Sequence, residues 1–421
     1  MVMQAHMFPA IEIPTPSQIN ATANQEMDEN GERSMILSMG PQHPSTHGVL
    51  RLAVEMKGET VINLAPDVGF LHTGIEKTIE TKTYTKSIVL TDRMDYLAPM
   101  SNNMVYVGAI EKLMHVDVPE RAQVLRVLFL ELTRLNSHLV WLGTHALDLA
   151  AMSVFFYTFR EREYILDIFE LVTGARMMTS YFRVGGLAWD VPNGFIPTVD
   201  EFLDYFAPRI DEYEDLLTNN LLWKQRTEGV GVISAEDAIA LGLTGANLRG
   251  SGVNWDLRKA MPYCGYETYT FDVPVGKHGD IYDRYLCRVQ EMRESVKICK
   301  QAIERLKALE GGPFVTSNRK VAPPPKHEIT YSMESLIHHF KLWTEGFKPP
   351  RGSVYFSIES PRGEIGCYLV SDGTPMPWRC HFRPPSFINI QALPHMAKGK
   401  LVADLVAMIA SLDPVLGEVD R

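Results

Sequence analysis

The first strong signal in this sequence is the stretch Gly40-Pro41-Gln42-His43-Pro44-Ser45-Thr46-His47-Gly48, which holds two imidazoles in a short connection. Each proline fixes φ and pushes the residue before it out of the α region, and the terminal glycines permit turns at both ends. The stretch is therefore predicted to be a stiffened loop that belongs to neither a helix nor a strand.

Residues on both sides of this loop carry strand patterns. Ser34 to Met39 is typical of a short strand, and apolar and polar side chains alternate from Leu50 to Lys57, as in a half-buried strand. The loop is thus expected to present His43 and His47 at the rim of a sheet. Such loops often carry functional groups, and histidine readily donates a proton near neutral pH. We expect His43 to cap backbone groups of its own loop and favour a functional role for His47.

The length and composition of the chain indicate a large globular protein with more than one subregion. Its 421 residues exceed the size at which single cores stop growing, and 45% of them are hydrophobic. The formal net charge of -10 at pH 7 and the pI near 5.7 argue against a nucleic-acid surface, which needs a clustered basic field. Nucleic acid is therefore not an expected partner.

The cysteines show no spacing typical of a metal or cluster motif. They are Cys264, Cys287, Cys299, Cys367 and Cys380, and no two are separated by only two residues. The odd number and the lack of a secretory signal predict reduced, buried thiols in a cytoplasmic compartment. The most membrane-like segment, Leu139 to Tyr157, contains His145 and Asp148 and is predicted to be a buried helix rather than a membrane span.

Four regions are predicted along the chain. Residues 1–33 are rich in Pro, Asn, Gln and Met without periodicity, and we expect a flexible arm there. An N-terminal α+β region with the histidine loop is predicted over 34–115, a helical bundle over 116–312 and a C-terminal α+β region over 313–421. Beyond the loop, a hairpin strand is predicted at Glu59–Leu64 and a second hairpin at Ser353–Val370. One helix is predicted to run from Asp117 past Leu139. The other predicted helices are Asn102–Met114, Ala150–Thr173, Thr198–Trp223, Asp280–Leu309, Ser332–Thr344 and Met396–Ser411.

Two clusters of polar side chains stand in apolar surroundings. The first, Asp92-Arg93-Met94-Asp95-Tyr96, is either a plain charged turn or part of a site. In the second, His145 and Asp148 stand three residues apart and would share a face if that segment is helical. Asp148 is either a helix cap or a buried carboxylate that needs a partner, because an unpaired charge in apolar surroundings is costly.

Taken together, these motifs resemble the 49-kDa-type (D-type) subunit family of the proton-pumping NADH:quinone oxidoreductase, respiratory complex I. The resemblance extends from about Met35 to Arg421. The combination of motifs is highly specific and consists of Gly40 to Arg51, Asp92 to Tyr96, Tyr181 to Gly186, Tyr282-Asp283-Arg284-Tyr285, Ser332-Met333-Glu334 with His338-His339, and Ser411-Leu412-Asp413-Pro414.

The resemblance implies a quinone headgroup site where the chain contacts an iron-sulfur partner subunit. His47 and Tyr96 would donate hydrogen bonds to the quinone carbonyls, Asp148 would pair with the histidine, and Arg93 would lie near the terminal iron-sulfur cluster. Quinone reduction takes two electrons and two protons, and a nearby carboxylate favours the protonated imidazolium. The fixed charge of the arginine would favour the reduced state. Met178 departs from the family pattern, because many members have there a histidine thought to couple cluster redox state to protonation, and methionine does not titrate.

The resemblance also implies a fold, partners and a location. The fold would be α+β and similar to the nickel-iron hydrogenase large subunit, with an N-terminal sheet region, a central bundle of long helices and a C-terminal region of hairpin and helix. The chain itself would bind no metal or redox cofactor, since the iron-sulfur clusters and FMN would belong to partner subunits. Expected partners are the iron-sulfur subunit with the terminal cluster, other peripheral-arm subunits and a membrane-arm subunit at the quinone channel. We expect a peripheral protein without transmembrane helices on the cytoplasmic face of the inner (cell) membrane.

Two other functions compete with this one. A hydrogenase large subunit needs four cysteine thiolates, one pair near each end of the chain, to hold its metals. The corresponding stretches here are Arg93-Met94-Asp95-Tyr96 and Asp413-Pro414-Val415-Leu416-Gly417-Glu418, which contain no thiolate, so metal catalysis of that kind is rejected. The other alternative is a purely structural scaffold, in which His47 and Tyr96 are ordinary packing groups.

Overall fold

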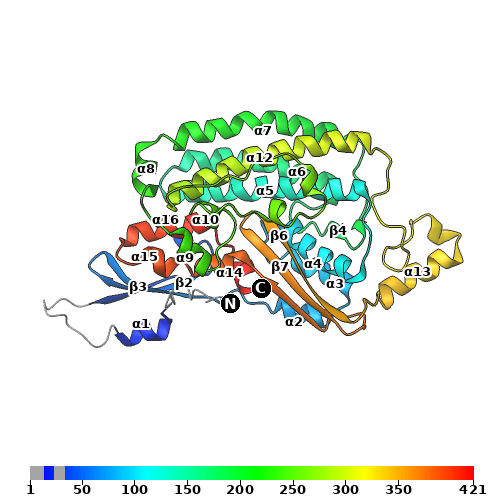
Figure 1. The fold of residues 1–421 in the computed structure, drawn as a ribbon, viewed down its shortest axis with the longest axis horizontal. Coiled ribbons are helices and arrows are strands. Elements are labelled where there is room, and N and C mark those ends of the chain that lie inside the picture. Colours follow the sequence, from blue (N-terminus) through cyan, green and yellow to red (C-terminus); the bar gives the residue numbers. More distant parts are fainter. Residues whose placement is uncertain (1–13, 23–33) are drawn as a thin grey trace, which may run out of the picture.

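The computed structural model describes residues 14–22 and 34–421. Its first sheet is antiparallel and consists of β1 (Met35–Met39), β2 (Arg51–Lys57) and β3 (Thr60–Asp67). Both strands predicted beside the histidine loop are confirmed, and so is the hairpin between β2 and β3. Figure 1 shows this sheet at the lower left, below the long helices.

A short helix, α1 (Pro16–Thr22), covers one face of this sheet. Its Ile19 is buried against Ala53 of β2 and Ala65 of β3. Most of the flexible arm predicted for residues 1–33 lies outside the described residues, residues 16–22 within it are helical, and the arm itself stays a prediction. The same helix explains why β2 is buried on both faces, whereas the alternation predicted only one buried face.

Three helices connect the first sheet to the bundle. They are α2 (Ile75–Glu80), α3 (Tyr84–Thr91) and α4 (Pro99–Met114). The last is the helix predicted from Asn102. It begins already at Pro99, because a missing N–H needs no partner in the first turn of a helix. The turn between α3 and α4 carries the Asp92–Tyr96 cluster.

Four long helices form a bundle along the top of the view in Figure 1. They are α5 (Glu120–Asp148), α6 (Met152–Thr173), α7 (Phe195–Leu217) and α12 (Ile281–Ala308). α5 packs against both α6 and α12, so it is buried along most of its length. Asp280 accepts a hydrogen bond from the Asp283 N–H and caps α12, which confirms the predicted start of that helix.

Several predicted helix boundaries differ from the structure. The N-cap of α5 is Pro119 rather than Asp117. The helix predicted over Thr198–Trp223 is two helices, α7 and α8 (Leu221–Thr227). Asn220 separates them, because its side chain accepts hydrogen bonds from the first N–H groups of α8.

Short elements fill the connections around the bundle. After α6 come the two-residue strands β4 (Phe182–Arg183) and β5 (Gly186–Leu187). Between α8 and α12 lie α9 (Ala235–Ala240), α10 (Ala246–Arg249), α11 (Leu257–Ala260) and the 3-10 turn η2 (Tyr266–Thr268).

A second antiparallel sheet lies below the bundle. It consists of β6 (Gly352–Ser360), β7 (Gly363–Ser371) and β8 (Arg379–Arg383). The hairpin predicted at Ser353–Val370 is confirmed as β6 and β7. β8 was not predicted, since it is short and has prolines on both sides.

The remaining C-terminal elements are helices. After the 3-10 turn η3 (Glu328–Thr330), the predicted helix α13 (Met333–Thr344) projects from the body at the right of Figure 1. The single helix predicted over Met396–Ser411 is two helices, with Gly399 in the connection between them. The last helices are α14 (Pro385–Ile390), α15 (Leu393–Ala397), α16 (Val402–Leu412) and α17 (Leu416–Asp420), of which α14 and α17 were not predicted.

Two hydrophobic cores hold these layers together. The larger core runs through the bundle, α4 and the second sheet, and the smaller one lies between the first sheet and the C-terminal helices α15 to α17. The predicted boundaries of the regions at 115/116 and 312/313 fall in connections outside α4, α5 and α12, but the division into regions stays a prediction.

A search of the described ranges 14–22 and 34–421 for membrane spans finds no helix with the length and apolar character that a crossing requires. Leu139–Tyr157 is not one buried helix, as predicted, but the end of α5 and the start of α6. Phe156, on the α6 part, is mostly exposed.

Candidate functional site

The histidine loop folds into a single 3-10 turn, η1 (Pro44–Thr46), between β1 and β2. His43 caps this turn, because its Nδ1 accepts a hydrogen bond from the Ser45 N–H at 3.2 Å. The local role predicted for His43 is thereby confirmed. His47 ends the turn in the left-handed region with φ of 52°, which is uncommon for a side chain with a Cβ.

His47 lies against the last residue of α5. Its Nε2 is 2.8 Å from Oδ2 of Asp148, and the two residues are 101 positions apart in the sequence. Their side chains are 14% and 16% exposed, so the pair lies near the surface without being fully solvated. The structure thus brings together the two residues that the resemblance pairs, and His47 is the hydrogen-bond partner of the Asp148 carboxylate.

His145 does not share in this pair, although α5 is helical through both His145 and Asp148. Its side chain is fully buried against Trp141 and Trp223, with ring centroids at 5.6 and 5.0 Å. Burial, together with the charge of Arg288, holds the pKa of His145 well below its usual value. His145 is therefore a neutral core residue, and only Asp148 points to the surface pair.

The turn before α4 holds Tyr96 in a fixed position. Asp95 accepts hydrogen bonds from the N–H groups of Leu97 and Ala98 at 3.0 and 3.2 Å, and Asn102 donates to the Asp95 carbonyl at 2.9 Å. Tyr96 is half-buried, and its hydroxyl has no hydrogen-bond partner in the part of the chain that the structure describes. Burial, followed by the charge of Asp95, raises the pKa of Tyr96, so the phenol stays protonated and its O–H can donate a hydrogen bond.

Asp92 and Arg93, in the same turn, face different environments. Asp92 is buried and accepts a hydrogen bond from Asn103 at 2.6 Å, and burial raises its pKa to about 7. Arg93 is exposed, and within residues 14–22 and 34–421 it has no carboxylate partner closer than 4 Å. The guanidinium therefore presents a positive charge to whatever covers this surface.

The histidine loop and the Tyr96 turn meet on the same short segment of chain. A Cβ added at Gly48 would contact the Leu416 side chain at 3.5 Å, and one added at Gly417 would lie 3.3 Å from the Tyr96 ring and 2.5 Å from the Met94 carbonyl oxygen. Consecutive residues of α17 thus support both loops, and only glycine fits at 417. We refer to His47, Tyr96 and Asp148 as the candidate site.

No direct sign in the sequence pointed to the α17 contribution. In the sequence, the stretch with Leu416 and Gly417 was considered only because it lacks the cysteines that a hydrogenase large subunit needs. Its contacts with the two loops involve residues more than 300 positions earlier in the chain. The one available signal was a glycine beside buried apolar residues, which often marks a close approach of two backbones.

Met178, the departure from the family pattern, lies in the connection after α6. It is half-buried with φ of 55°. Its thioether carries no titratable proton. Asp92 lies near this connection: burial raises its pKa, while the charge of Arg183 and the backbone of Ser180 oppose that shift.

No group of three or more His, Cys, Asp or Glu side chains suited to a metal ion occurs in the portion of the chain that the structure covers. All five cysteines are free, and Cys264 is the one that is not fully buried. Two large cavities, of about 860 and 820 Å³, are lined by other residues: the first by the start of α12 and its neighbours, the second by β5, the Pro323–Pro325 stretch and Trp343. The candidate site thus lies at the surface rather than in either of these cavities.

The candidate site combines two potential proton donors with a carboxylate. A protonated His47 that donates Nε2–H to Asp148 keeps its Nδ1–H free, and Tyr96 keeps its hydroxyl proton. Such a set can donate hydrogen bonds to oxygen acceptors of a small molecule.

Comparison with known proteins identifies the family. The family model described as "Respiratory-chain NADH dehydrogenase, 49 Kd subunit" matches residues 148–421. The chain is 83% identical to the first D-type NADH-quinone oxidoreductase subunit of Herpetosiphon aurantiacus over the full length of both chains. It is 72% identical to the second D-type subunit of Chloroflexus aurantiacus, covering 99% of this chain and 100% of that one, and 59% identical to the D-type subunit of Geotalea uraniireducens, covering 92% and 98%. The chain therefore belongs to the 49-kDa, or D-type, subunit family of respiratory NADH-quinone oxidoreductase, complex I.

Proposed function

We propose that this chain forms the quinone headgroup site of the complex together with an iron-sulfur partner subunit. The observation that carries the proposal is the hydrogen bond between His47 and Asp148, which holds an imidazole near the surface on a loop that contacts Leu416, beside the Gly417 that supports the Tyr96 ring. The position of the candidate site at the surface supports a pocket that is completed by a second subunit. Arg93 would face that subunit and its terminal cluster.

In the proposed reaction His47 and Tyr96 donate hydrogen bonds to the two quinone carbonyls. Asp148 stabilises the imidazolium through Nε2, so that Nδ1–H is directed to one carbonyl oxygen. As two electrons arrive from the partner's cluster, the proton of His47 moves to one oxygen and that of Tyr96 to the other, and both residues are reprotonated afterwards. The charge of Arg93 favours the arrival of electrons near this face.

Several wider features belong to the same proposal. The chain would share the fold of the nickel-iron hydrogenase large subunit and bind no redox cofactor of its own. NADH oxidation at FMN would occur in other subunits, and quinone reduction would be coupled to proton translocation. The subunit would lie on the cytoplasmic face of the membrane, next to the membrane-arm subunit at the quinone channel.

The test is a double-mutant cycle on the assembled complex. His47→Ala should remove most quinone reduction, while Asp148→Asn should reduce it, because the carboxylate that holds the imidazole in place is gone. The double variant should be little worse than His47→Ala alone, since residues that act as a unit are not additive. Transfer from NADH to an artificial acceptor reports on the upstream part of the complex and should stay normal.

His43→Ala is the matched control, since His43 is in the same loop but only caps η1. It should leave quinone reduction largely unchanged. An equal loss in His43→Ala and His47→Ala, or full additivity of His47→Ala with Asp148→Asn, would contradict the proposal and favour a scaffold.

A further inference from the structure

Arg362 is a buried arginine at the tight turn between β6 and β7. Its side chain has no measurable exposure, and Gly363 beside it is held against Thr244 and Gly245. The Arg362 carbonyl accepts a hydrogen bond from Asn389 at 3.3 Å. The direction of its guanidinium is thus determined by the packing of the turn.

The guanidinium of Arg362 connects three segments that support the candidate site. It donates to Oδ2 of Asp95 at 2.6 Å and to the Ser137 hydroxyl of α5 at 2.9 Å. It also donates to the carbonyl of Asp413 at 3.1 Å and lies 3.4 Å from its carboxylate. Asp95 precedes Tyr96, α5 ends at Asp148, and Asp413 leads into α17.

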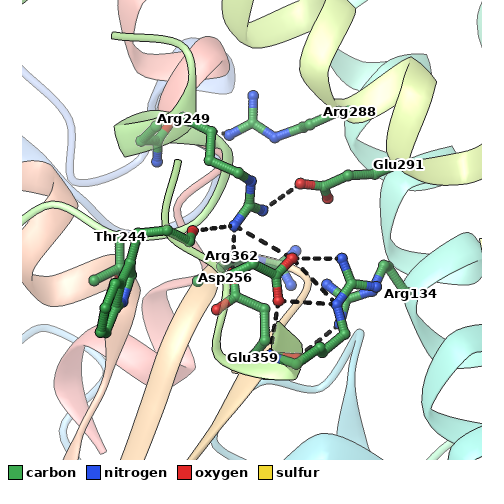
Figure 2. Close-up of polar contacts among 12 residues, drawn as sticks. Arg134, Thr244, Arg249, Asp256, Arg288, Glu291, Glu359 and Arg362 are labelled. Atoms are coloured by element: carbon green, nitrogen blue, oxygen red, sulfur yellow. Dashed lines mark hydrogen bonds and ion pairs between the residues drawn. The ribbon is translucent and has the colours of Figure 1, made fainter. Parts of the chain in front are cut away.

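Other buried arginines nearby have different partners. Figure 2 shows Arg249 between Glu291 and Glu359, and Arg134 against the end of β6. Arg134 bonds to the carbonyls of Glu359 and Ser360 and to Glu131, all of them inside the contact between the bundle and the second sheet. Arg362 differs because its acidic partners belong to the turn of Tyr96 and the segment before α17.

We propose that Arg362 is a positioning residue for quinone reduction, which fixes the Tyr96 turn relative to α5 and α17. The inference rests on the proposed function of Tyr96. Arginine suits the task, since its planar fork reaches several acceptors at once, whereas the compact ammonium of lysine does not. Without it, the buried carboxyl groups of Asp95 and Asp413 would lose the guanidinium that contacts both of them, at 2.6 and 3.4 Å.

Arg362→Lys in the assembled complex tests the proposal, with Arg134→Lys as the matched control. Arg362→Lys should lower quinone reduction by roughly tenfold, mostly through a higher KM, with normal transfer from NADH to an artificial acceptor. In a Tyr96→Phe background the same change should cost less than about threefold, because the group that it positions no longer donates. Arg134→Lys should cost the same with or without Tyr96→Phe.

Equal losses from Arg362→Lys in both backgrounds would overturn the proposal and leave Arg362 a structural residue. If Arg362→Lys does not assemble, Asp95→Asn breaks the same contact from its other end and is judged by the same two-background comparison. If Tyr96→Phe alone has no effect, the proposed role of Tyr96 fails. Arg362 is then judged by KM alone, and an unchanged KM for quinone in Arg362→Lys would overturn the positioning role.

Discussion

The His47–Asp148 pair and a buried network of charged side chains are built from similar chemical groups, but they differ in burial and in the number of partners. The network on α5, α10, α11, α12 and β6 is almost completely buried, and each charge has several partners: Glu131, Arg134, Arg249, Asp256, Arg258, Glu291 and Glu359. Burial alone would raise the pKa of Glu291, but the charge of Arg249 and the hydrogen bond from His138 hold it well below its usual value. Its proton state is therefore fixed at neutral pH.

The His47–Asp148 pair, in contrast, has one contact and remains partly exposed. A group that is to exchange protons has to stay near water and keep an open donor, and a group that is to hold elements together gains from complete enclosure. The number of partners and the degree of enclosure, rather than residue type, separate the buried network from the pair proposed to exchange protons. The predictions below test that separation.

The largest effect is expected from breaking the network. Arg258→Met leaves Glu131 and Asp256 buried without the guanidinium that donates to both, and removal of one partner of a buried pair typically costs about 3–5 kcal/mol. Urea unfolding of the full chain measures this loss. A loss below about 1 kcal/mol would mean that the enclosed charges do not hold the bundle to the second sheet.

A second prediction concerns Glu418, which is buried and whose nearby positive charge is too weak to offset the effect of burial on its pKa. Burial, and then the charge of Asp95, raise its pKa to about 8, while Arg362 opposes the shift and Ser386 donates to it. Because the folded-state pKa exceeds the unfolded value of 4.5, the stabilisation is complete below about pH 4.5 and is lost as the pH rises through about 8. Glu418→Gln should remove this part of the pH dependence, which amounts to at most about 1.4 kcal/mol per pH unit.

The measurement is the unfolding free energy of the full chain at several values between pH 5 and pH 9, for wild type and Glu418→Gln. The two curves should diverge toward alkaline pH, with the variant the more stable. Parallel curves would mean that Glu418 is ionised throughout and that enclosure alone does not set its proton state.

Tyr96 shares a feature with each of the two regions. Its ring packs on α17, as in an enclosed group, while its hydroxyl has no hydrogen-bond partner among the described residues. Tyr96→Phe keeps the packing and removes one donor, so quinone reduction should fall roughly tenfold, equivalent to about 1.4 kcal/mol, while stability and assembly stay normal. Steady-state rates with a short-chain quinone provide the check, and wild-type rates would take Tyr96 out of the candidate site.

The smallest effect is expected on the open surface. Lys300 and Asp204 form an ion pair at 2.7 Å with side chains 46% and 69% exposed. Lys300→Ala should change the unfolding free energy by less than about 1 kcal/mol, since water and salt screen such pairs. A loss of unfolding free energy as large as that of Arg258→Met would mean that the burial of an ion pair does not determine how much it stabilises the fold.

Local signals predicted the parts of the fold that depend on neighbours in the sequence. The helices predicted at Asp280–Leu309 and Ser332–Thr344 are α12 and α13, and the strand patterns on both sides of the histidine loop identified β1 and β2. The apolar periodicity continues through Asn220, so it predicted one helix where the Asn220 cap separates α7 from α8. Short elements such as α17 carry too few residues for any period to register.

The candidate site was reached differently. His47, Tyr96 and Asp148 were chosen through resemblance, because nothing in local pattern says that Asp148 meets a residue 101 positions earlier. Arg362 received no role from the sequence, since its partners Asp95 and Asp413 lie 267 and 51 positions away. Long-range pairing of charges is decided by topology, and single-sequence patterns do not encode it.

The support of both site loops by α17 also has a mechanical consequence. Leu416 and Gly417 are joined by one planar peptide, whose Cα atoms stay about 3.8 Å apart in any motion. A tilt of α17 therefore cannot move the loop of His47 without also moving the turn of Tyr96. A substrate bound between the two loops, as proposed above, would therefore contact two walls that shift together when α17 is displaced.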